Sequence, residues 1–185
     1  MLNGLSLHLS ILKKTPIPMY GVDIKHLKKY IIKSKKRLVD YLKKADNQNG
    51  SCAVVVGAEW YQNNLQYCHE MVAKYVPEWK QCEVYRDLHD VRIVAVIALK
   101  SNKKQSSRIN KRVVDRAYKQ KKPTICAYTR NELERDKATA EHIVPLSSGG
   151  NNSVWNICVA DNDLNNRRGN MNFWKYWRSV LSSGL

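Results

Sequence analysis

The most informative part of the chain is residues 141–170, which have the sequence EHIVPLSSGGNNSVWNICVADNDLNNRRGN. Two short apolar runs, 142–146 and 154–160, lie on either side of a loop of serine, glycine and asparagine, a composition typical of turns. The second run passes into a segment rich in Asp and Asn, where Asp161 is suited to cap the start of a helix. The pattern predicts a β-hairpin followed by a helix.

The side chains on this hairpin and helix suit the hydrolysis of a phosphodiester. His142 follows a carboxylate, and a neutral imidazole can take a proton from water near pH 7. Carboxylate and amide oxygens are hard ligands that suit Mg²⁺, which keeps several waters and binds through few protein groups. Arginines in the helix can bind phosphate oxygens. A base, a metal site and phosphate-binding cations together indicate a phosphodiesterase.

Residues 126–170 resemble the motif of the HNH endonuclease family, in which two strands and a helix surround a metal ion (the ββα-metal fold). The matching residues are the Glu141-His142 pair, Asn156 and Asn165, with a Gly-Gly loop after the pair and Arg-Arg-Gly-Asn near the end. The resemblance covers about a quarter of the chain and leaves the upstream residues unmatched. It implies an α+β fold with a C-terminal ββα-metal motif.

The resemblance also implies a role for each matched residue. His142 would be the general base that activates the attacking water. Glu141 and Asn165 would hold one Mg²⁺, or another divalent cation such as Mn²⁺. Asn156 would brace the hairpin loop and orient the histidine without touching the metal.

The predicted helix after the hairpin would supply the remaining contacts. The resemblance assigns Arg167 and Arg168 to backbone phosphates. Asn165 and Arg168 are three residues apart, so on a helix they share a face. Asn162 and Asn166 remain alternatives to Asn165 as the metal ligand.

The five cysteines do not match the zinc pattern found in many members of this family. Those members hold the motif with two C-x-x-C pairs on zinc, and this chain has no such pair. Cys126 keeps one cysteine of a first pair, and Cys158 lies outside any second pair. We therefore expect packing in place of structural zinc, with the thiols reduced and mostly buried.

The charge of the chain indicates a polyanionic partner. Its 185 residues carry a formal net charge of +16, and two blocks, 13–44 and 100–138, each contribute +9. The predicted catalytic quarter, 139–185, is nearly neutral. We expect DNA as the partner, double-stranded DNA above all, bound by the basic blocks. A basic helix is expected over about 109–120, and its candidate DNA contacts are Lys111, Arg112, Arg116 and Lys119.

Upstream of the motif, the spacing of apolar residues predicts helices. Residues 23–44 are expected to form one amphipathic helix. Residues 56–76 are expected to be helical up to Pro77. The apolar run 90–100 fits either a strand or a helix.

These patterns divide the chain into two expected parts. Residues 1–108 would form a basic, mainly helical region able to bind DNA, and residues 109–185 the nuclease domain. A last amphipathic helix would pack on the core through Phe173, Trp174, Trp177 and Leu181. Stacking of these aromatic rings on nucleic-acid bases is the alternative.

The function expected from the sequence is a metal-dependent DNA endonuclease, of the homing type found in phages and mobile elements. No segment reaches the roughly 18 apolar residues of a membrane span, and residues 1–12 lack the features of a signal peptide. We therefore expect a cytoplasmic protein without a membrane partner. The alternatives are a catalytically degenerate DNA- or RNA-binding protein on the same scaffold, and a structural RNA-binding protein.

Overall fold

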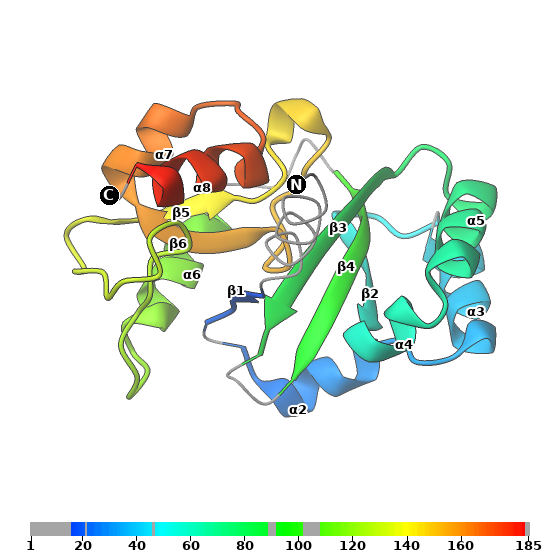
Figure 1. Cartoon of the computed structure of the whole chain (residues 1–185). Helices are drawn as coiled ribbons and strands as arrows, with labels where there is room; N and C mark the ends of the chain where they lie inside the picture. Colours follow the sequence, from blue (N-terminus) through cyan, green and yellow to red (C-terminus); the bar gives the residue numbers. More distant parts are fainter. Residues whose placement is uncertain (1–15, 21, 46, 89–91, 102–107, 184–185) are drawn as a thin grey trace, which may run out of the picture.

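The protein is an α+β structure, as the sequence predicts, and its elements divide into a four-stranded sheet and a two-stranded ribbon. The computed structural model describes residues 16–20, 22–45, 47–88, 92–101 and 108–183. Figure 1 shows the sheet in the middle, helices α3, α4 and α5 on one side of it, and the ribbon with α6, α7 and α8 on the other.

The sheet has the strand order β1-β3-β4-β2. Strands β2, β4 and β3 pair antiparallel, and the short β1 adds to β3 in parallel. Residues Val94 to Leu99 of the central strand β4 are all at most 2% exposed, because both faces of the sheet are covered. The strands are β1 (Ile17–Pro18), β2 (Cys52–Gly57), β3 (Lys80–Asp87) and β4 (Ile93–Lys100).

Helices of the N-terminal part cover one face of this sheet. Leu38 and Leu42 of α3, with Cys68 and Val72 of α5, pack into a hydrophobic cluster with Val54 of the sheet. The helices are α2 (Ile24–Leu27), the 3-10 turn η1 (Lys28–Tyr30), α3 (Lys35–Ala45), α4 (Ala58–Gln62) and α5 (Leu65–Tyr75). Helix α5 ends before Pro77, as predicted.

The prediction of one helix over 23–44 is wrong. The chain is extended at Ile31 and Ile32, where the backbone of Ile32 bonds to that of Val55 and Gly57 at 2.9 Å each. In extended backbone, neighbouring side chains point to opposite sides. Ile31 therefore enters the core shared with the ribbon and Ile32 the core beneath α3 and α5, which one helix could not achieve.

The expectation of a mainly helical N-terminal region is also wrong, since all four strands of the sheet lie within it. The ambiguous run 90–100 contains β4, and the segment predicted as helix over 56–76 begins inside β2. Strand β2 pairs with β4, which lies far along the chain, and a local pattern does not reveal such a partner.

The C-terminal part contains the predicted hairpin and helix. Strands β5 and β6 pair antiparallel, with Glu141 opposite Cys158 and His142 opposite Ile157. Asp161 caps the following helix, since its carboxylate accepts the backbone N–H groups of Asp163 and Leu164. The elements are α6 (Arg108–Ala117), β5 (Ala138–His142), η2 (Leu146–Ser148), β6 (Ile157–Asp161), α7 (Asn162–Arg168) and α8 (Phe173–Ser182).

The first strand of the hairpin lies earlier than the predicted run 142–146. It ends at His142, and the 3-10 turn η2 follows Pro145. Gly150 lies so close to this turn that an added Cβ would be 1.9 Å from the Val144 carbonyl oxygen. The Gly-Gly pair therefore permits a compact loop that side chains would prevent.

The sheet and the ribbon share one hydrophobic core. It joins Val84 and Val94 of the sheet to Ile157, Phe173 and Trp177 of the C-terminal part. The expected boundary at 108/109 is thus not a boundary between two separate cores. Helix α8 packs through Phe173, Tyr176, Trp177 and Val180, whereas Leu181 is 42% exposed and not buried as expected.

Polar contacts add to this shared core. Asn151, fully buried, donates its amide N–H groups to the carbonyls of Cys52 (2.8 Å) and Lys100 (3.0 Å). It thereby ties the hairpin loop to the ends of β2 and β4. In the part of the chain that the structure describes, every helix is too short or too polar to cross a membrane.

Candidate active site

Residues of the hairpin, η2 and α7 line a pocket of about 220 Å³ that is open to solvent. Four of the predicted site residues line it, from two elements: Glu141 and His142 at the end of β5, and Asn165 and Arg168 on α7. Its rim includes Ser147, Gly169 and Asn170. The fold therefore brings together a carboxylate, an imidazole and a carboxamide that are up to 24 positions apart in the sequence.

His142 is half-buried and held by one side chain. Its Nε2 lies 2.8 Å from the amide oxygen of Asn152. An amide oxygen only accepts hydrogen bonds, so Nε2 carries the proton and Nδ1 keeps its lone pair. This tautomer leaves Nδ1 able to take a proton from a water molecule in the pocket.

Asn156 is 1% exposed and holds the hairpin loop by its backbone. Its amide oxygen accepts the N–H of Val144, and its amide nitrogen donates to the carbonyls of Val144 and Asn151, all at 2.9 Å. The N–H of Ile143 also bonds to the Asn156 carbonyl at 2.9 Å. These contacts fix the chain directly after His142, which sets the direction in which β5 presents the imidazole.

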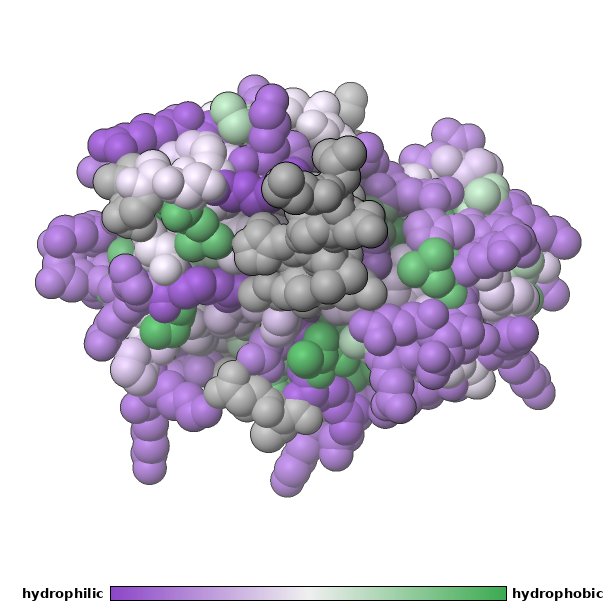
Figure 2. All heavy atoms as spheres, in the orientation of Figure 1, coloured by the Kyte–Doolittle hydropathy of each residue, from purple (hydrophilic) through white to green (hydrophobic). Residues whose placement is uncertain are grey.

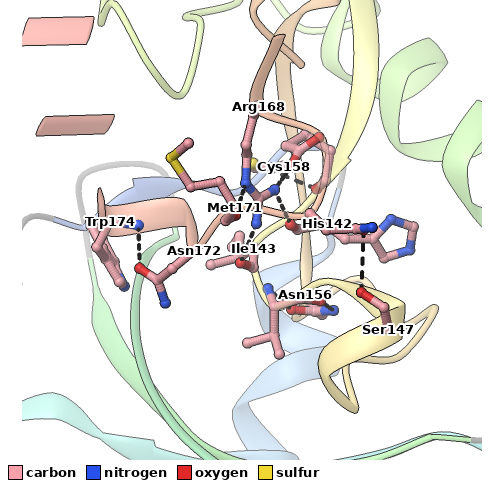
Figure 3. A network of polar contacts seen from close by, with 12 residues as sticks. His142, Ile143, Ser147, Asn156, Cys158, Arg168, Met171, Asn172 and Trp174 are labelled. Carbon is pink, nitrogen blue, oxygen red and sulfur yellow. Dashed lines mark hydrogen bonds and ion pairs between the residues drawn. The ribbon is translucent and has the colours of Figure 1, made fainter. Parts of the chain in front are cut away.

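Glu141 and Arg168 form a buried ion pair. Each is only 3% exposed, and Nη1 of Arg168 contacts Oε1 of Glu141. The guanidinium also donates to the carbonyls of Met171 (2.7 Å), His142 (2.7 Å) and Ile143 (3.2 Å), as Figure 3 shows. Burial lowers the pKa of Arg168, because the charged form loses its contact with water.

This position corrects the prediction that Arg168 contacts DNA phosphate. Its donors are directed at Glu141 and at backbone carbonyls, because α7 docks with this side chain turned towards β5. Arg167, the neighbouring residue, is exposed and lies outside the pocket. Of the two predicted phosphate contacts, only Arg167 is placed where solvent and DNA can reach it.

The donor set of the pocket is suited to a hard divalent cation. Glu141, a carboxylate, and Asn165, a carboxamide, line the pocket, whereas Asn162 and Asn166 do not. Among the described residues, no three His, Cys, Asp or Glu side chains gather closely enough to form a metal cluster. Two oxygen ligands fit Mg²⁺, which completes its shell with waters and substrate phosphate.

The cysteines near the ribbon are buried thiols. Cys126 and Cys158 are each 1% exposed and unbridged. Burial raises the pKa of Cys158 to about 12, so this thiol stays protonated at neutral pH.

The basic helix α6 lies across the ribbon from α7 (Figure 1). Lys111, Arg112, Arg116 and Lys119 are all exposed. Lys111 also lines a cavity of about 260 Å³ that shares Ala140 with the pocket. Lys119 lies beyond the end of the helix, because α6 stops at Ala117. The face of the molecule in Figure 2 is mostly hydrophilic, with only small separate apolar areas.

Three residues of the site were not predicted as such. Asn152 holds His142, and Ser147 donates its hydroxyl to the amide oxygen of Asn170 at 3.2 Å, at the rim of the pocket. The sequence offered one signal for Asn152, namely its place in the loop between the two strands that carry the motif. Ser147 and Asn170 meet only because η2 and the end of α7 are folded together, for which no local pattern exists.

No protein-family model, curated protein or solved structure matches this chain. A function for the chain is therefore inferred from the geometry and chemistry of the pocket.

Proposed function

We propose that this protein is a metal-dependent endonuclease of the HNH type that hydrolyses phosphodiester bonds in DNA. The observation that carries the proposal is the pocket in which Glu141, His142 and Asn165 meet. A base with a free ring nitrogen and two hard oxygen ligands at one surface are the parts that phosphodiester hydrolysis requires.

In this proposal His142 acts as the general base. Nδ1 takes a proton from water, and the resulting hydroxide attacks the phosphorus atom while the bond to the leaving oxygen breaks. Asn152 keeps the proton on Nε2 and stabilises the imidazolium that forms, because its amide oxygen lies 2.8 Å from that nitrogen. Asn156 holds the backbone that carries the base.

Glu141 and Asn165 would hold the metal ion, Mg²⁺ or Mn²⁺. When bound, such an ion polarises the phosphate and stabilises charge on the leaving oxygen. Arg168 positions Glu141 for this purpose by holding one of its two oxygens. The Arg168 contacts to the carbonyls of His142 and Ile143 tie α7 to the same strand end.

Duplex DNA is the substrate that the charge distribution favours. Arg167 and the exposed cations of α6 present positive charge on two sides of the ribbon. The basic N-terminal part suits a phage or mobile-element nuclease of the homing type.

A second function, DNA or RNA binding without catalysis, is favoured by one specific feature. Glu141 is almost inaccessible and already paired with a cation, Arg168. If this pair keeps the metal out, the scaffold would bind nucleic acid without cutting it.

Cleavage of supercoiled plasmid separates the two functions. The full chain should convert the plasmid to nicked or linear DNA with Mg²⁺ or Mn²⁺, and EDTA should stop it. His142→Ala should lower the rate by about 10²- to 10⁴-fold, the usual contribution of a general base. His69→Gln is the matched control, since His69 lies on α5, outside both basic blocks and outside the pocket, and should leave the rate unchanged. Intact plasmid at every protein and metal concentration, with DNA binding retained, would establish the second function instead.

A further inference from the structure

A second cavity lies directly beside the catalytic pocket. Its volume is about 330 Å³, and it shares Pro145 and Asn170 with the pocket. One wall is strand β3 of the sheet, and the other is η2 and the start of α8. We call it the β3 groove and define it by Lys80, Gln81, Pro145, Asn170, Asn172 and Trp174. The N-terminal part thus forms one side of a groove that continues into the catalytic pocket.

Trp174 gives this groove a fixed aromatic surface. Its ring is half-buried and makes edge contacts with Phe173 (centroids 5.2 Å apart) and Trp177 (5.6 Å). Figure 3 shows Trp174 with Asn172. The amide oxygen of Asn172 caps α8 by accepting the backbone N–H of Trp174 at 3.0 Å. A ring held in this way can stack on a nucleic-acid base at little entropic cost.

Hydrogen-bond donors surround this ring. The amide oxygen of Asn172 is used by the cap, so the exposed NH₂ group of the same side chain is left to face outward. Asn170 likewise uses its oxygen for Ser147. Donors of this kind suit phosphate and base oxygens, which are acceptors.

Lys80 adds a positive charge at the same place. Its side chain is exposed and lies over the Gly-Gly turn, where a Cβ added at Gly149 would be 3.3 Å from Lys80 Cβ. One carboxylate, Glu83, also lines the groove, and it accepts the hydroxyl of Tyr85 at 3.0 Å. The Lys80 side of the groove is therefore the side suited to a phosphate.

We propose that the β3 groove binds the polynucleotide strand next to the scissile phosphate, with one base stacked on Trp174 and its phosphate bound by Lys80 and Asn172. Small-molecule pockets are roughly 300 Å³ or larger, so a groove of this volume suits one nucleotide, which must be unpaired from the duplex substrate in order to stack on Trp174. The identification of the ligand rests on the proposed nuclease function.

Binding of a fluorescent single-stranded oligodeoxynucleotide in EDTA tests this proposal without any cleavage. We would measure fluorescence anisotropy with the full-length His142→Ala chain as the parent. Adding Trp174→Ala should weaken binding about 5- to 150-fold, the loss of one stacked base. Trp174→Phe should retain most of the affinity, because Phe also stacks.

Lysine variants test the phosphate contact. Lys80→Gln should weaken binding and reduce the slope of log K against log salt by about 0.7, the value for one phosphate contact on a single strand. Lys74→Gln is the matched control, since Lys74 is exposed on α5, away from the groove, and should change neither quantity. Equal affinities for the parent and Trp174→Ala, or an unchanged salt slope for Lys80→Gln, would overturn the proposal.

Tryptophan quenching and a comparison with the plasmid assay make the result decisive. If Trp174→Ala unfolds, quenching of tryptophan emission by the oligonucleotide can be measured in place of its binding affinity. The emission of the parent should be quenched, and that of Trp174→Phe much less. Equal quenching of the two would refute the stacking contact. If the wild-type chain cuts plasmid but Trp174 and Lys80 do not affect binding, the groove fails and the nuclease stands. If no plasmid is cut but both residues affect binding, the nuclease fails and the groove stands.

Discussion

The four-stranded sheet and the β5–β6 ribbon are stabilised in different ways. The centre of the sheet is apolar, and the run Val94 to Leu99 is buried without a single polar side chain. The ribbon and its loop instead bury Glu141, Asn151, Asn156 and Arg168, each of which bonds to a specific partner. Apolar burial tolerates exchange of similar groups, whereas a buried polar group depends on its partner. The ribbon should therefore be the part more sensitive to single changes.

The sheet also buries a charged side chain, Arg86, but its partners differ from those of Arg168. Arg86 on β3 is fully buried and donates to the carbonyls of Pro18 (3.2 Å), Trp155 (3.4 Å) and Ile157 (3.0 Å). Burial lowers the pKa of Arg86 to about 10. Arg168 also bonds to carbonyls, but it has a carboxylate partner in addition. Removing Arg86 leaves neutral acceptors unpaired, and removing Arg168 leaves a charge.

The largest effect is expected for Arg168→Met. Loss of one partner from a buried ion pair costs about 3–5 kcal/mol, so we expect the free energy of unfolding to fall by about 4 kcal/mol. Urea unfolding followed by circular dichroism measures it. The double variant Glu141→Gln with Arg168→Met should recover part of the loss, because it removes the orphaned charge. A double variant no more stable than the single one would show that the carbonyl contacts, and not the ion pair, matter most.

Arg86→Met should have the next largest effect. It leaves three carbonyls without this donor, at about 1 kcal/mol each, so a loss of about 3 kcal/mol is expected from the same unfolding curves. Because Trp155 and Ile157 belong to the ribbon segment, the ribbon should loosen first, with faster hydrogen exchange at β6 than at β4. Uniform exchange at both strands would mean that the two regions respond as one unit.

Gly150→Ala tests how tightly the ribbon loop is packed. The added Cβ would meet the Val144 carbonyl oxygen at 1.9 Å, and overpacking costs roughly 1–3 kcal/mol, so we expect a loss of about 2 kcal/mol in thermal unfolding. Gly169→Ala is the control, because its Cβ would meet no atom within 4 Å and only its positive φ of 53° opposes the substitution. A loss for Gly150→Ala no larger than that for Gly169→Ala would mean that the loop relaxes around the added methyl group.

The difference between the two regions also explains what could be predicted from the sequence. Around the ribbon the signals are local: Gly-Gly at the turn and Asp161 at the cap determine structure within a few residues. In the sheet, some of the contacts that decide the structure join residues far apart in the sequence. Strand β3 has the sequence KQCEVYRD, in which charged and apolar residues do not alternate regularly, and its Arg86 is buried only because the ribbon segment supplies carbonyls some 70 positions away.

The candidate site shows the same limit. The resemblance to the HNH motif implied that Glu141, His142 and Asn165 lie together, and these three residues line one pocket. The buried position of Arg168 could not be predicted, because it depends on how α7 docks against β5. Asn152 was missed as well, since its contact with His142 crosses a loop whose course depends on Asn156.

The smallest expected effect is the pH dependence of stability that arises from buried thiols. In this effect the two regions behave alike. Burial raises the pKa of Cys158 in the ribbon to about 12 and that of Cys68 on α5 to about 11, from 9.0 for a free thiol. Above pH 9 the unfolded chain releases a proton that the folded chain keeps. Stability therefore falls as pH rises from 9 towards each folded-state pKa.

Each thiol should account for about 1 kcal/mol of the stability lost between pH 9 and 10, since a fully titrating group contributes about 1.4 kcal/mol per pH unit. Cys158→Ala and Cys68→Ala should each reduce this pH dependence by that amount, measured by urea unfolding at both pH values. Between pH 10 and 11 the Cys158 contribution should exceed that of Cys68, because the folded-state pKa of Cys68 is lower and its thiol begins to ionise in the folded chain as well. If the free energy of unfolding of Cys158→Ala changed with pH as much as that of the parent, this thiol would ionise within the folded protein. The ribbon would then admit solvent where the sheet does not.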